Sequence, residues 1–380
     1  MSHSKLLVQL IFMMFIIMLF TLFFVLIYRF EMNEKKVTNQ VQRDYYVVKK
    51  FTITNTISVA AIGDILLHKD VYESARISLN EFDFKPIFNE VRPILLKPDF
   101  LVANQESLPA GGDLGLSSYP RFNSPVEIIR DLQYAGVDFL STANNHSLDK
   151  GEEGVYASIE AFNSYDMPYT GTYLHEEDQK RIRTFSMNSI TFATLSYTYG
   201  TNGLLTPVGK EYLVNLLDVD KMILEITRAK EELNVDFVIV NLHWGNEYEI
   251  HPSNNQVDMA ISLTEAGADI IFGHHPHVLQ PIYIRNTQDD RKAVIAYSLG
   301  NFISGQRGGQ KDLGGMISLE CHKTQLAGRK SNSIHSVHFY PTYVRKVKGS
   351  FTVLPFTEDQ HDIPYSFEAT MEHVLPSYTE

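Results

Sequence analysis

A chain of 380 residues, of which 44% are hydrophobic and 21% charged, can bury a large core and belongs among the globular proteins. Its formal net charge of -12 argues against general binding to nucleic acid or anionic lipid, since both require a positive field, so an acidic polymer would need a local basic patch. The single cysteine, Cys321, excludes an intramolecular disulfide framework and argues against a thiolate metal cluster.

The first predicted element is a membrane-spanning helix over residues 6–28. Apolar side chains fill this stretch almost without interruption. At about 1.5 Å per residue it can cross a hydrocarbon core of about 30 Å. A cleavable signal peptide is the alternative, but its apolar region should be only about 7 to 15 residues and end in a small-residue cleavage site. Residues 29–32 offer no such site, which favours an uncleaved anchor.

The anchor divides the chain into further segments. Residues 1–5 form a short tail, and residues 29–50 are polar and charged without an apolar period, which is typical of a juxtamembrane linker. We expect one folded domain over residues 51–350 and a C-terminal tail over 351–380. Lys5 lies on one side of the anchor, whereas the basic residues on the other side are Arg29, Lys35 and Lys36. This charge count alone would place the body inside the cell.

The folded body begins with three strand patterns that each end in polar residues. Their apolar runs cover residues 57–62, 99–103 and 137–142. The polar residues after them are, in order, Asp64, then Asn104 and Glu106, then Asn145 and His146. Ligands bind outside the carboxyl ends of strands in such sheets because the loops converge there.

Helix patterns separate these strands. Residues 71–79 and 86–96 lie between the first two strands, and residues 126–135 precede the third, with Gly136 as the expected C-cap. This alternation is typical of β-α-β units.

The second half of the body starts with a predicted hairpin over residues 181–198, around Asn188-Ser189. Further helices are expected over residues 154–165, 217–233 and 257–266. Strands are expected over residues 235–242, 269–272, 293–297, 315–321 and 336–344. The polar or aromatic residues after the first three of these strands are His243, Trp244 and Glu247, then His274, His275 and His277, then Asn301.

The histidines at 274–277 indicate a metal site. Imidazole is a common metal ligand, and an H-x-H spacing can supply two ligands from one turn, although a histidine-rich surface loop is the alternative. Six strand ends with polar residues in one order favour a shared site. Mixed carboxylate, amide and imidazole ligands suit Mn, Fe or Zn better than Ca, and two ions about 4 Å apart would activate a water between them.

The motif series closely resembles the CapA/PgsA family of poly-γ-glutamate capsule proteins, which is related to the calcineurin-like metallophosphoesterases. The motifs are Gly63-Asp64, Asn104-Gln105-Glu106, Ala143-Asn144-Asn145-His146, His243-Trp244-Gly245-Asn246-Glu247, Gly273-His274-His275-Pro276-His277 and Ser298-Leu299-Gly300-Asn301-Phe302. The resemblance covers about residues 56–305. It implies a four-layer α-β-β-α metallophosphoesterase-like sandwich, preceded by one N-terminal transmembrane helix.

The resemblance also implies a site with one or two divalent ions. Its metal ligands would be Asp64, Glu106, Asn145, His243, His275 and His277. Glu106 would take the place of the bridging carboxylate. His146 would act as a general acid, although a hydrogen bond within its loop is an equal alternative.

Several further residues are candidates for the same site. Leu66 stands where the phosphoesterases have a metal-binding histidine, and His68 is the nearest substitute. His274 competes with His275 as a ligand, and Asn104 belongs to the Glu106 motif. Glu247 could orient a ligating imidazole, Asn301 could fix a loop, and Trp244 could line a groove or pack in the core.

The function implied by the resemblance is an accessory component of a membrane poly-γ-glutamate synthase. Its partners would be other membrane subunits, the anionic polyglutamate polymer and membrane lipid, with no nucleic acid. The chain would cross the cell membrane once, with its N-terminus inside and its body on the extracellular side. Two alternatives stay open: an active metal-dependent hydrolase of a phosphoester or of the polymer's amide bonds, and a non-catalytic module that binds an anionic polymer.

Overall fold

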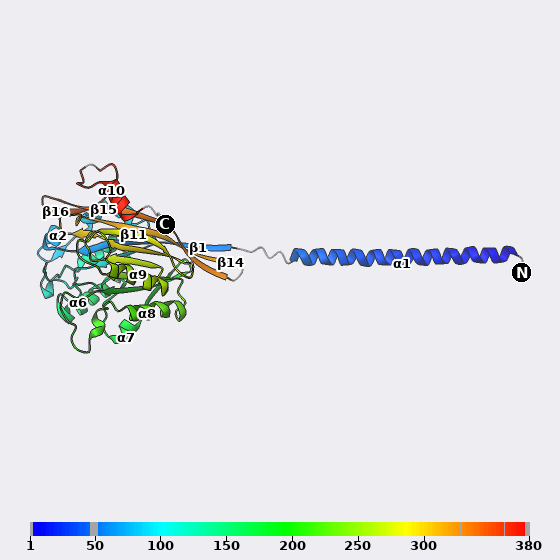
Figure 1. Ribbon diagram of the computed structural model, residues 1–380, viewed down its shortest axis with the longest axis horizontal. Helices are drawn as coiled ribbons and strands as arrows, with labels where there is room; N and C mark the ends of the chain where they lie inside the picture. Colours follow the sequence, from blue (N-terminus) through cyan, green and yellow to red (C-terminus); the bar gives the residue numbers. More distant parts are fainter. Residues whose placement is uncertain (1–2, 46–51, 327–328, 361, 377–380) are drawn as a thin grey trace. The chain divides into compact units, whose positions relative to one another are not determined.

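The computed structural model describes residues 3–45, 52–326, 329–360 and 362–376 of the chain (Figure 1). The chain divides into two compact units. One unit contains residues 1–52 and 326–328, and the other contains residues 53–325 and 329–380.

The N-terminal unit is one long helix, α1 His3–Tyr45. Its segment Lys5–Lys35 has a mean hydropathy of 3.1 and is long and apolar enough to cross a membrane, by length and composition. The helix extends past the predicted span of residues 6–28 into the stretch expected to be a linker, because residues 31–45 contain no Gly or Pro to end it. The rest of that stretch, residues 46–50, lies outside the described residues.

The body contains two large sheets and a short hairpin, β2-β3. The eight-stranded sheet has the order β16-β15-β14-β1-β4-β5-β6, with β13 beside β1. Its strands are β1 Thr52–Leu66, β4 Phe100–Gln105, β5 Phe139–Ser141, β6 Tyr169–Thr170, β13 Asn301–Ser304, β14 Leu313–Leu326, β15 Arg329–Val347 and β16 Ser350–Pro355. Strand β1 pairs in parallel with β4 and β13, and β4, β5 and β6 follow in parallel. Their carboxyl ends therefore share one edge.

The six-stranded sheet has the order β11-β12-β10-β9-β8-β7. Its strands are β7 Arg183–Met187, β8 Ile190–Thr198, β9 Phe237–His243, β10 Ile270–His274, β11 Leu279–Asn286 and β12 Lys292–Leu299. The four central strands are parallel, and β7 and β11 are antiparallel edge strands. The predicted hairpin is confirmed as β7-β8, whose turn residues Asn188 and Ser189 have φ of 45° and 63°. Positive φ at both positions is the type I′ geometry that suits hairpins.

Most predicted helices are confirmed, with one clear exception. The helices are α2 Lys69–Ser74, α3 Lys85–Phe88, α4 Arg92–Leu95, α5 Glu127–Ala135, α6 Gly151–Ser164, α7 Glu176–Lys180, α8 Val219–Glu231, α9 Asn254–Glu265 and α10 Phe367–Val374. The helix predicted over residues 71–79 is wrong beyond Ser74, because the chain turns into the hairpin of β2 Arg76–Ser78 and β3 Glu81–Phe82. The helix predicted over 86–96 is divided at residues 89–91, because Pro93 in the first turn of α4 cannot continue the helix from the preceding turn.

Gly136 ends α5 as predicted. Its φ is 115°, and its backbone N–H donates to the carbonyl oxygens of Leu132 and Gln133. A left-handed residue with these hydrogen bonds satisfies carbonyls that would otherwise lack a partner at the helix end. The chain is thereby directed into β5, which delivers Asn145 and His146.

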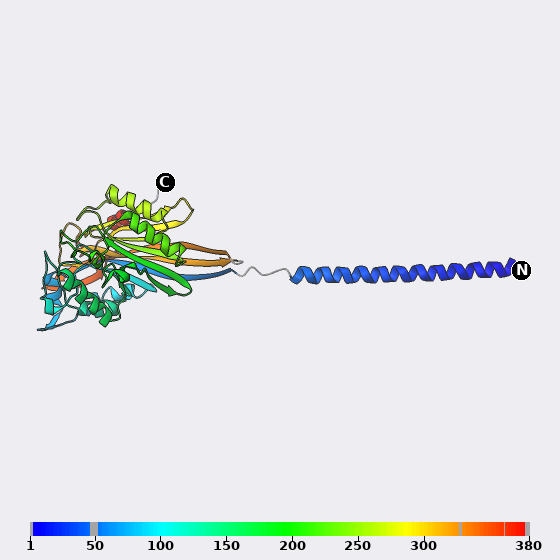
Figure 2. The ribbon, with the colours of Figure 1, turned by 90° about the horizontal axis from the view of Figure 1, so that it is seen from below.

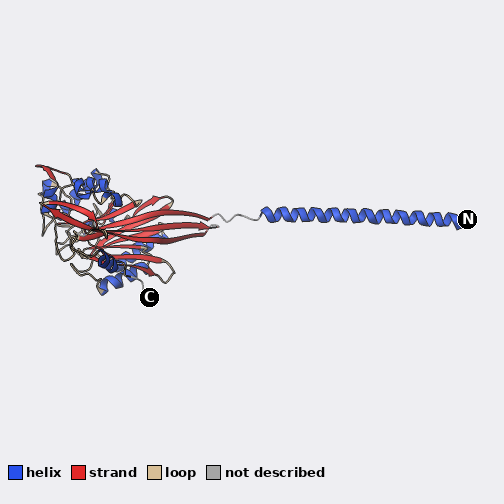
Figure 3. Ribbon diagram, turned by 90° about the horizontal axis from the view of Figure 1, so that it is seen from above, coloured by secondary structure: helices blue, strands red, loops and turns tan. Residues whose placement is uncertain are grey.

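Three apolar clusters divide the body into four layers. One cluster lies between the sheets and includes Val59 and Val102 from one sheet and Phe272 from the other. A second joins the outer face of the eight-stranded sheet to helices α2–α6, and a third joins the outer face of the six-stranded sheet to α8 and α9. Helices lie on either side of the strands (Figure 2, Figure 3). The α-β-β-α sandwich implied by the family resemblance is therefore confirmed.

The stretch expected to be a C-terminal tail contributes to the body. Strand β16 pairs with β15 in antiparallel fashion and buries Phe351 and Val353. Helix α10 places Val374 in the cluster between the sheets. Because apolar and polar residues alternate through β16, one face of this strand can pack while the other faces solvent. The packed body thus extends beyond residue 350.

Candidate metal centre

The polar residues predicted at the strand ends come together across the two sheets. The Asn104 side chain, on β4, donates from Nδ2 to Asp64 Oδ1 on β1 at 2.8 Å. His277 Nδ1 lies 3.1 Å from Asp64 Oδ2 and 3.1 Å from Asn301 Oδ1 on β13. The contact between Asp64 and His277 joins residues more than 200 positions apart in the sequence. They place the end of the β10 loop directly over the end of β1.

Glu106 lies between two imidazoles of this cluster. Its Oε1 is 3.5 Å from His243 Nε2 and 3.7 Å from His277 Nε2. His243 Nε2 also lies 2.9 Å from the Asn145 side-chain oxygen. Carboxylate, amide and imidazole groups from four different strand ends thus converge on one small volume.

Three overlapping sets of side chains have donor atoms within 4.8 Å of one another, close enough to hold a metal ion. The sets are Asp64, Glu106 and His277; Glu106, His243 and His275; and Glu247, His275 and His277. All of these residues are buried except Glu247, which is exposed. Glu106 belongs to two sets, which is the position that a bridging carboxylate requires.

The Glu106 side chain has an unbalanced charge. It is fully buried, and neither of its carboxylate oxygens has a hydrogen-bond partner among the described residues. Burial raises the pKa of Glu106 well above its ordinary value, and the negative charge of Asp64 adds to this effect although His277 opposes it. A buried carboxylate without hydrogen bonds is costly unless a cation pairs with it. The donor set therefore fits a divalent ion of the Mn, Fe or Zn kind.

The imidazoles of the cluster differ in charge. Burial lowers the pKa of His243 well below its ordinary value, and burial lowers the pKa of His275 to about 3, so both rings are neutral at pH 7. Burial opposes protonation of His277, but the charges of Glu106 and Asp64 outweigh it and raise the pKa of His277 to about 9. Burial also opposes ionisation of Asp64, yet His274 and His277 lower the pKa of Asp64 well below its usual range. Neutral imidazole is the form that binds metals, so His243 and His275 are in that form already, whereas His277 would release its proton when an ion binds.

The backbone after β10 selects which histidines face the cluster. A Cβ at Gly273 would lie 2.0 Å from the Tyr297 carbonyl oxygen, so only glycine lets β10 run this close to β12. His275 and His277 follow with φ of 96° and 59°, a left-handed geometry that costs about 1–3 kcal/mol at such positions. His274 is the last residue of β10. Its Nδ1 lies 3.3 Å from Asp64 Oδ1, and it belongs to none of the three sets. The geometry thus favours His275 over His274.

His146 belongs to a hydrogen-bonded pair that the sequence reasoning missed. Its Nδ1 lies 2.7 Å from Asp149 Oδ2, and the Phe122 backbone N–H donates to the same oxygen at 2.5 Å. The Phe122 ring also packs edge-on against the His146 ring, at 4.6 Å between centroids. These contacts hold the His146 ring in place through Nδ1 and its ring face, and Nε2 is the other ring nitrogen. The sequence does contain a signal for this pair, because Asp149 is an acidic residue three positions after His146.

The other candidates divide between support and packing. His68 Nδ1 accepts a hydrogen bond from the Gly305 N–H at 3.2 Å, and burial lowers the pKa of His68 to about 4. His68 belongs to no donor set in the described part of the chain, so it does not replace the imidazole absent at Leu66. Asn301 donates to the Lys311 carbonyl oxygen at 2.8 Å and so fixes the loop after β13.

Two aromatic residues flank the cluster. Trp244 is buried, stacks on Tyr297 and donates from Nε1 to the Tyr297 carbonyl oxygen at 3.0 Å, which is a packing role. Tyr199, which the sequence reasoning did not identify, has its ring 4.6 Å from the His275 ring. Both side chains line a cavity of about 260 Å³ beside the cluster. Tyr199 thus covers one side of the imidazoles.

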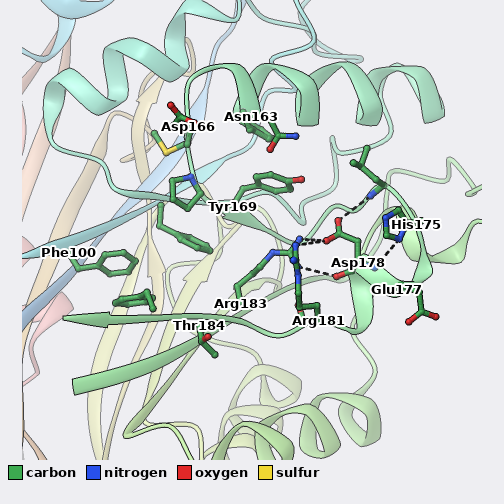
Figure 4. A pocket seen from close by; sticks show the side chains of 16 residues that line it. Phe100, Asn163, Asp166, Tyr169, His175, Glu177, Asp178, Arg181, Arg183 and Thr184 are labelled. Atoms are coloured by element: carbon green, nitrogen blue, oxygen red, sulfur yellow. Dashed lines mark hydrogen bonds and ion pairs between the residues drawn. The ribbon is translucent and has the colours of Figure 1, made fainter. Parts of the chain in front are cut away.

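A larger hollow, of about 790 Å³, lies at the edge of the sandwich. Its lining includes Phe100, Tyr169 and Asp178, and Figure 4 shows two arginines that point toward that aspartate. Arg183 Nη2 and Arg181 Nη2 lie 2.8 Å and 3.2 Å from Asp178 Oδ1. The predicted metal ligands do not line this hollow.

Comparison with known proteins places the chain in a family. The model of the family described as bacterial capsule synthesis protein PGA_cap matches residues 58–306. The capsule biosynthesis protein CapA of Bacillus anthracis is 32% identical over 261 residues, which cover 66% of this chain and 60% of that protein. The PGA biosynthesis protein CapA of Bacillus subtilis (strain 168) is 29% identical over 262 residues, which cover 66% of this chain and 64% of the relative. The match thus spans less than two thirds of either relative.

Among solved structures, a Thermus thermophilus sulfate thiohydrolase, SoxB, in complex with glycerol is similar with a TM-score of 0.39 and 16% identity, covering 67% of this chain and 38% of the other. The family match runs from β1 to just beyond β13 and includes every strand end that carries a predicted ligand. The chain therefore belongs to the PGA_cap family of bacterial capsule synthesis proteins, as its motifs indicate.

Proposed function

We propose that this chain is a membrane-anchored component of poly-γ-glutamate capsule synthesis and export that carries a hydrolytic divalent-metal centre. The observation that supports this proposal most is Glu106, a fully buried carboxylate that lies between two imidazoles and has no hydrogen-bond partner among the residues that the structure describes. Membership of the PGA_cap family supports the capsule role. The name of the Bacillus subtilis relative, a PGA biosynthesis protein, supports the polymer.

The metal would be held by two groups of residues that share Glu106. One group is Asp64, Glu106 and His277, and the other is Glu106, Asn145, His243 and His275. When bound, such ions polarise a phosphoryl or carbonyl oxygen and lower the pKa of a water. Manganese, iron or zinc suits this donor set, with one or two ions bound.

The chain's own residues would orient the substrate and transfer a proton. Asp149 Oδ2 lies 2.7 Å from His146 Nδ1 and so holds the orientation of the ring. His146 Nε2 is then the atom that donates a proton to the leaving group. Tyr199, packed over His275, limits the access of bulk water to that side of the cluster.

The helix α1 would anchor the chain, with the N-terminus inside and the body on the extracellular side. The apolar segment Lys5–Lys35 and the capsule role support this arrangement. Other membrane subunits of the synthase, the polymer and the surrounding lipid would be its partners. Protease treatment of intact cells tests the topology, since the body should be cleaved, and a protected body would contradict an extracellular location.

Metal analysis and an activity assay on the full chain in detergent test the centre. We expect one or two ions per chain and hydrolysis of a phosphodiester or of polyglutamate, both lost in His243→Ala. Arg181→Ala, at the sandwich edge, is the matched control and should keep both. A wild-type chain with neither metal nor turnover would refute the hydrolase and leave a polymer-binding module as the better description.

A genetic test addresses the capsule role separately. Deletion of the gene should abolish surface polyglutamate, and the wild-type gene should restore it. Unchanged surface polymer in the deletion strain would refute the capsule role, whatever the metal content.

A further inference from the structure

A groove of about 400 Å³ lies beside the His146-Asp149 pair. Its lining comprises Arg121, Leu148, Asp149, Lys150, Gly151, Glu152, Leu204, Leu205 and Pro207. Asp149 belongs to both the groove and the pair. The groove therefore adjoins the group that we assign to proton transfer.

Two cations of this groove have no partner. Among the residues that the structure describes, neither Arg121 nor Lys150 forms an ion pair or a side-chain hydrogen bond, and both side chains reach solvent. The carboxylate of Glu152, which also lines the groove, is already paired with Lys210. The lining contains two cations and two carboxylates, but Asp149 is paired with His146 just as Glu152 is paired with Lys210, which leaves Arg121 and Lys150 as its unpaired charges. These two cations supply the local positive charge that an acidic polymer requires, although the whole chain is strongly acidic.

The backbone fixes these two cations beside the pair. Arg121 precedes Phe122, whose N–H donates to Asp149 Oδ2, and Lys150 follows Asp149 directly. One short hydrogen bond thus brings two separate loops together and sets both cations next to the residue that orients His146. Exposed cations on a rigid backbone can bind an anion at modest entropic cost.

Part of the groove lining is an apolar wall. Leu204, Leu205 and Pro207 form it, and Leu205 is 90% exposed. The loop that carries this wall contacts the cluster, since the Asn145 side-chain amide donates to Asn202 Oδ1 at 3.4 Å. Apolar side chains and two cations in one groove match a chain that carries methylene groups and negative charges in alternation.

We propose that this groove binds a polycarboxylate chain, with Arg121 and Lys150 on its carboxylates and the wall of Leu204, Leu205 and Pro207 on its methylenes. This inference rests on the proposed function, because a γ-glutamyl repeat carries one carboxylate and two methylenes. The groove holds the polymer alongside His146 and orients it toward the metal cluster. Arg121 and Lys150 determine the preference for an anionic chain and take no part in proton transfer.

Binding of fluorescently labelled poly-γ-glutamate oligomers to the full chain in detergent, measured by anisotropy in EDTA, tests this groove without any metal. Removal of both cations in Arg121→Ala with Lys150→Ala should weaken binding about tenfold, whereas Arg121→Lys with Lys150→Arg should retain it. Leu205→Ser should weaken binding about threefold. Arg181→Ala removes an exposed arginine at the other hollow and should leave the affinity unchanged.

Three outcomes would contradict polymer binding in this groove: wild-type affinity in the double alanine variant, an equal loss of affinity in Arg181→Ala, or no binding by the wild type. Inorganic polyphosphate serves as the second probe. If it binds as tightly and depends equally on both cations, the groove is a general anion site and the assignment to a polycarboxylate is wrong. Metal content and the His243→Ala comparison are measured separately. The proposal for the groove can therefore be refuted while the proposal for the metal centre is supported, and the metal centre can be refuted while polymer binding in the groove is supported.

Discussion

The cluster of candidate metal ligands and the hollow at the sandwich edge each contain a buried carboxylate, but the two carboxylates differ in their partners. In the hollow, Asp178 accepts hydrogen bonds from Arg183 and Arg181, so its carboxylate is neutralised by the protein itself (Figure 4). In the cluster, Glu106 is fully buried and its oxygens have no hydrogen-bond partner among the described residues. The hollow has a volume of about 790 Å³, and its lining contains none of the buried polar atoms that lack a hydrogen-bond partner in the described part of the chain.

This difference shows that an unbalanced buried charge is a stronger indicator of a site than cavity size. A carboxylate removed from water without a partner destabilises the fold, and a paired one does not. Selection for stability alone would favour the arrangement around Asp178. The arrangement around Glu106 is explained if a bound cation pairs with its carboxylate.

The largest expected effect is the loss of metal in Glu106→Gln. The amide keeps the shape of the side chain but removes the charge shared by both ligand groups. We expect metal content to fall from one or two ions to none and turnover to fall by at least about 10³-fold. Elemental analysis and a phosphodiester assay measure the two quantities. Full metal content in this variant would contradict the contrast between the two regions, since Glu106 would then be no more important for metal binding than Asp178.

The matched substitution at the sandwich edge is Asp178→Ala. Removal of this carboxylate leaves the Arg183 guanidinium without its partner, which should lower the free energy of unfolding by about 3 kcal/mol. Metal content should stay as in the wild type. Thermal unfolding in detergent, followed by circular dichroism, measures the first quantity. A loss of metal here would show that the two regions are coupled.

Metal removal should then separate the two sites by stability. Saturation at about 100 times the dissociation constant stabilises the folded state by about 2.7 kcal/mol, so EDTA should lower the unfolding temperature of the wild type. Glu106→Gln should not respond to EDTA, whereas Asp178→Ala should respond as the wild type does. An equal response of both variants would mean that the ion binds elsewhere.

The smallest effect is expected for Asp149→Asn. The amide can still contact His146 but is a weaker hydrogen-bond acceptor and holds the ring less firmly, so turnover should fall about tenfold with metal content unchanged. A shifted pH profile of turnover would support a positioning role. An unchanged rate and profile would show that the hydrogen bond serves only the fold of the loop.

The strand ends were predictable from the sequence because the pattern is local. Each apolar run that ends in Asp64, Glu106, Asn145 or His243 is visible within about ten residues, and parallel strands must end at one edge. The long strands of the sandwich were underestimated, as with β14 Leu313–Leu326 and β15 Arg329–Val347. Their exposed halves lack the apolar periodicity that indicates a strand.

The details of the site could not be predicted, because they depend on contacts between distant segments. The left-handed backbone at His275 and His277 comes directly after Gly273, where β10 packs close to β12, and spacing alone does not reveal this geometry. The pairing of Asp149 with His146 depends on the Phe122 backbone in another loop. The role of His68 was left open by spacing alone, and only its contact with Gly305 shows that it supports a loop.

The most direct test of the metal centre is a crystal structure of the chain with manganese, in which anomalous scattering locates the ions. An ion within about 2.0 to 2.2 Å of a Glu106 oxygen, with His243 or His277 as a further ligand, is the expected result. The absence of any ion at Glu106 under saturating manganese would contradict the account.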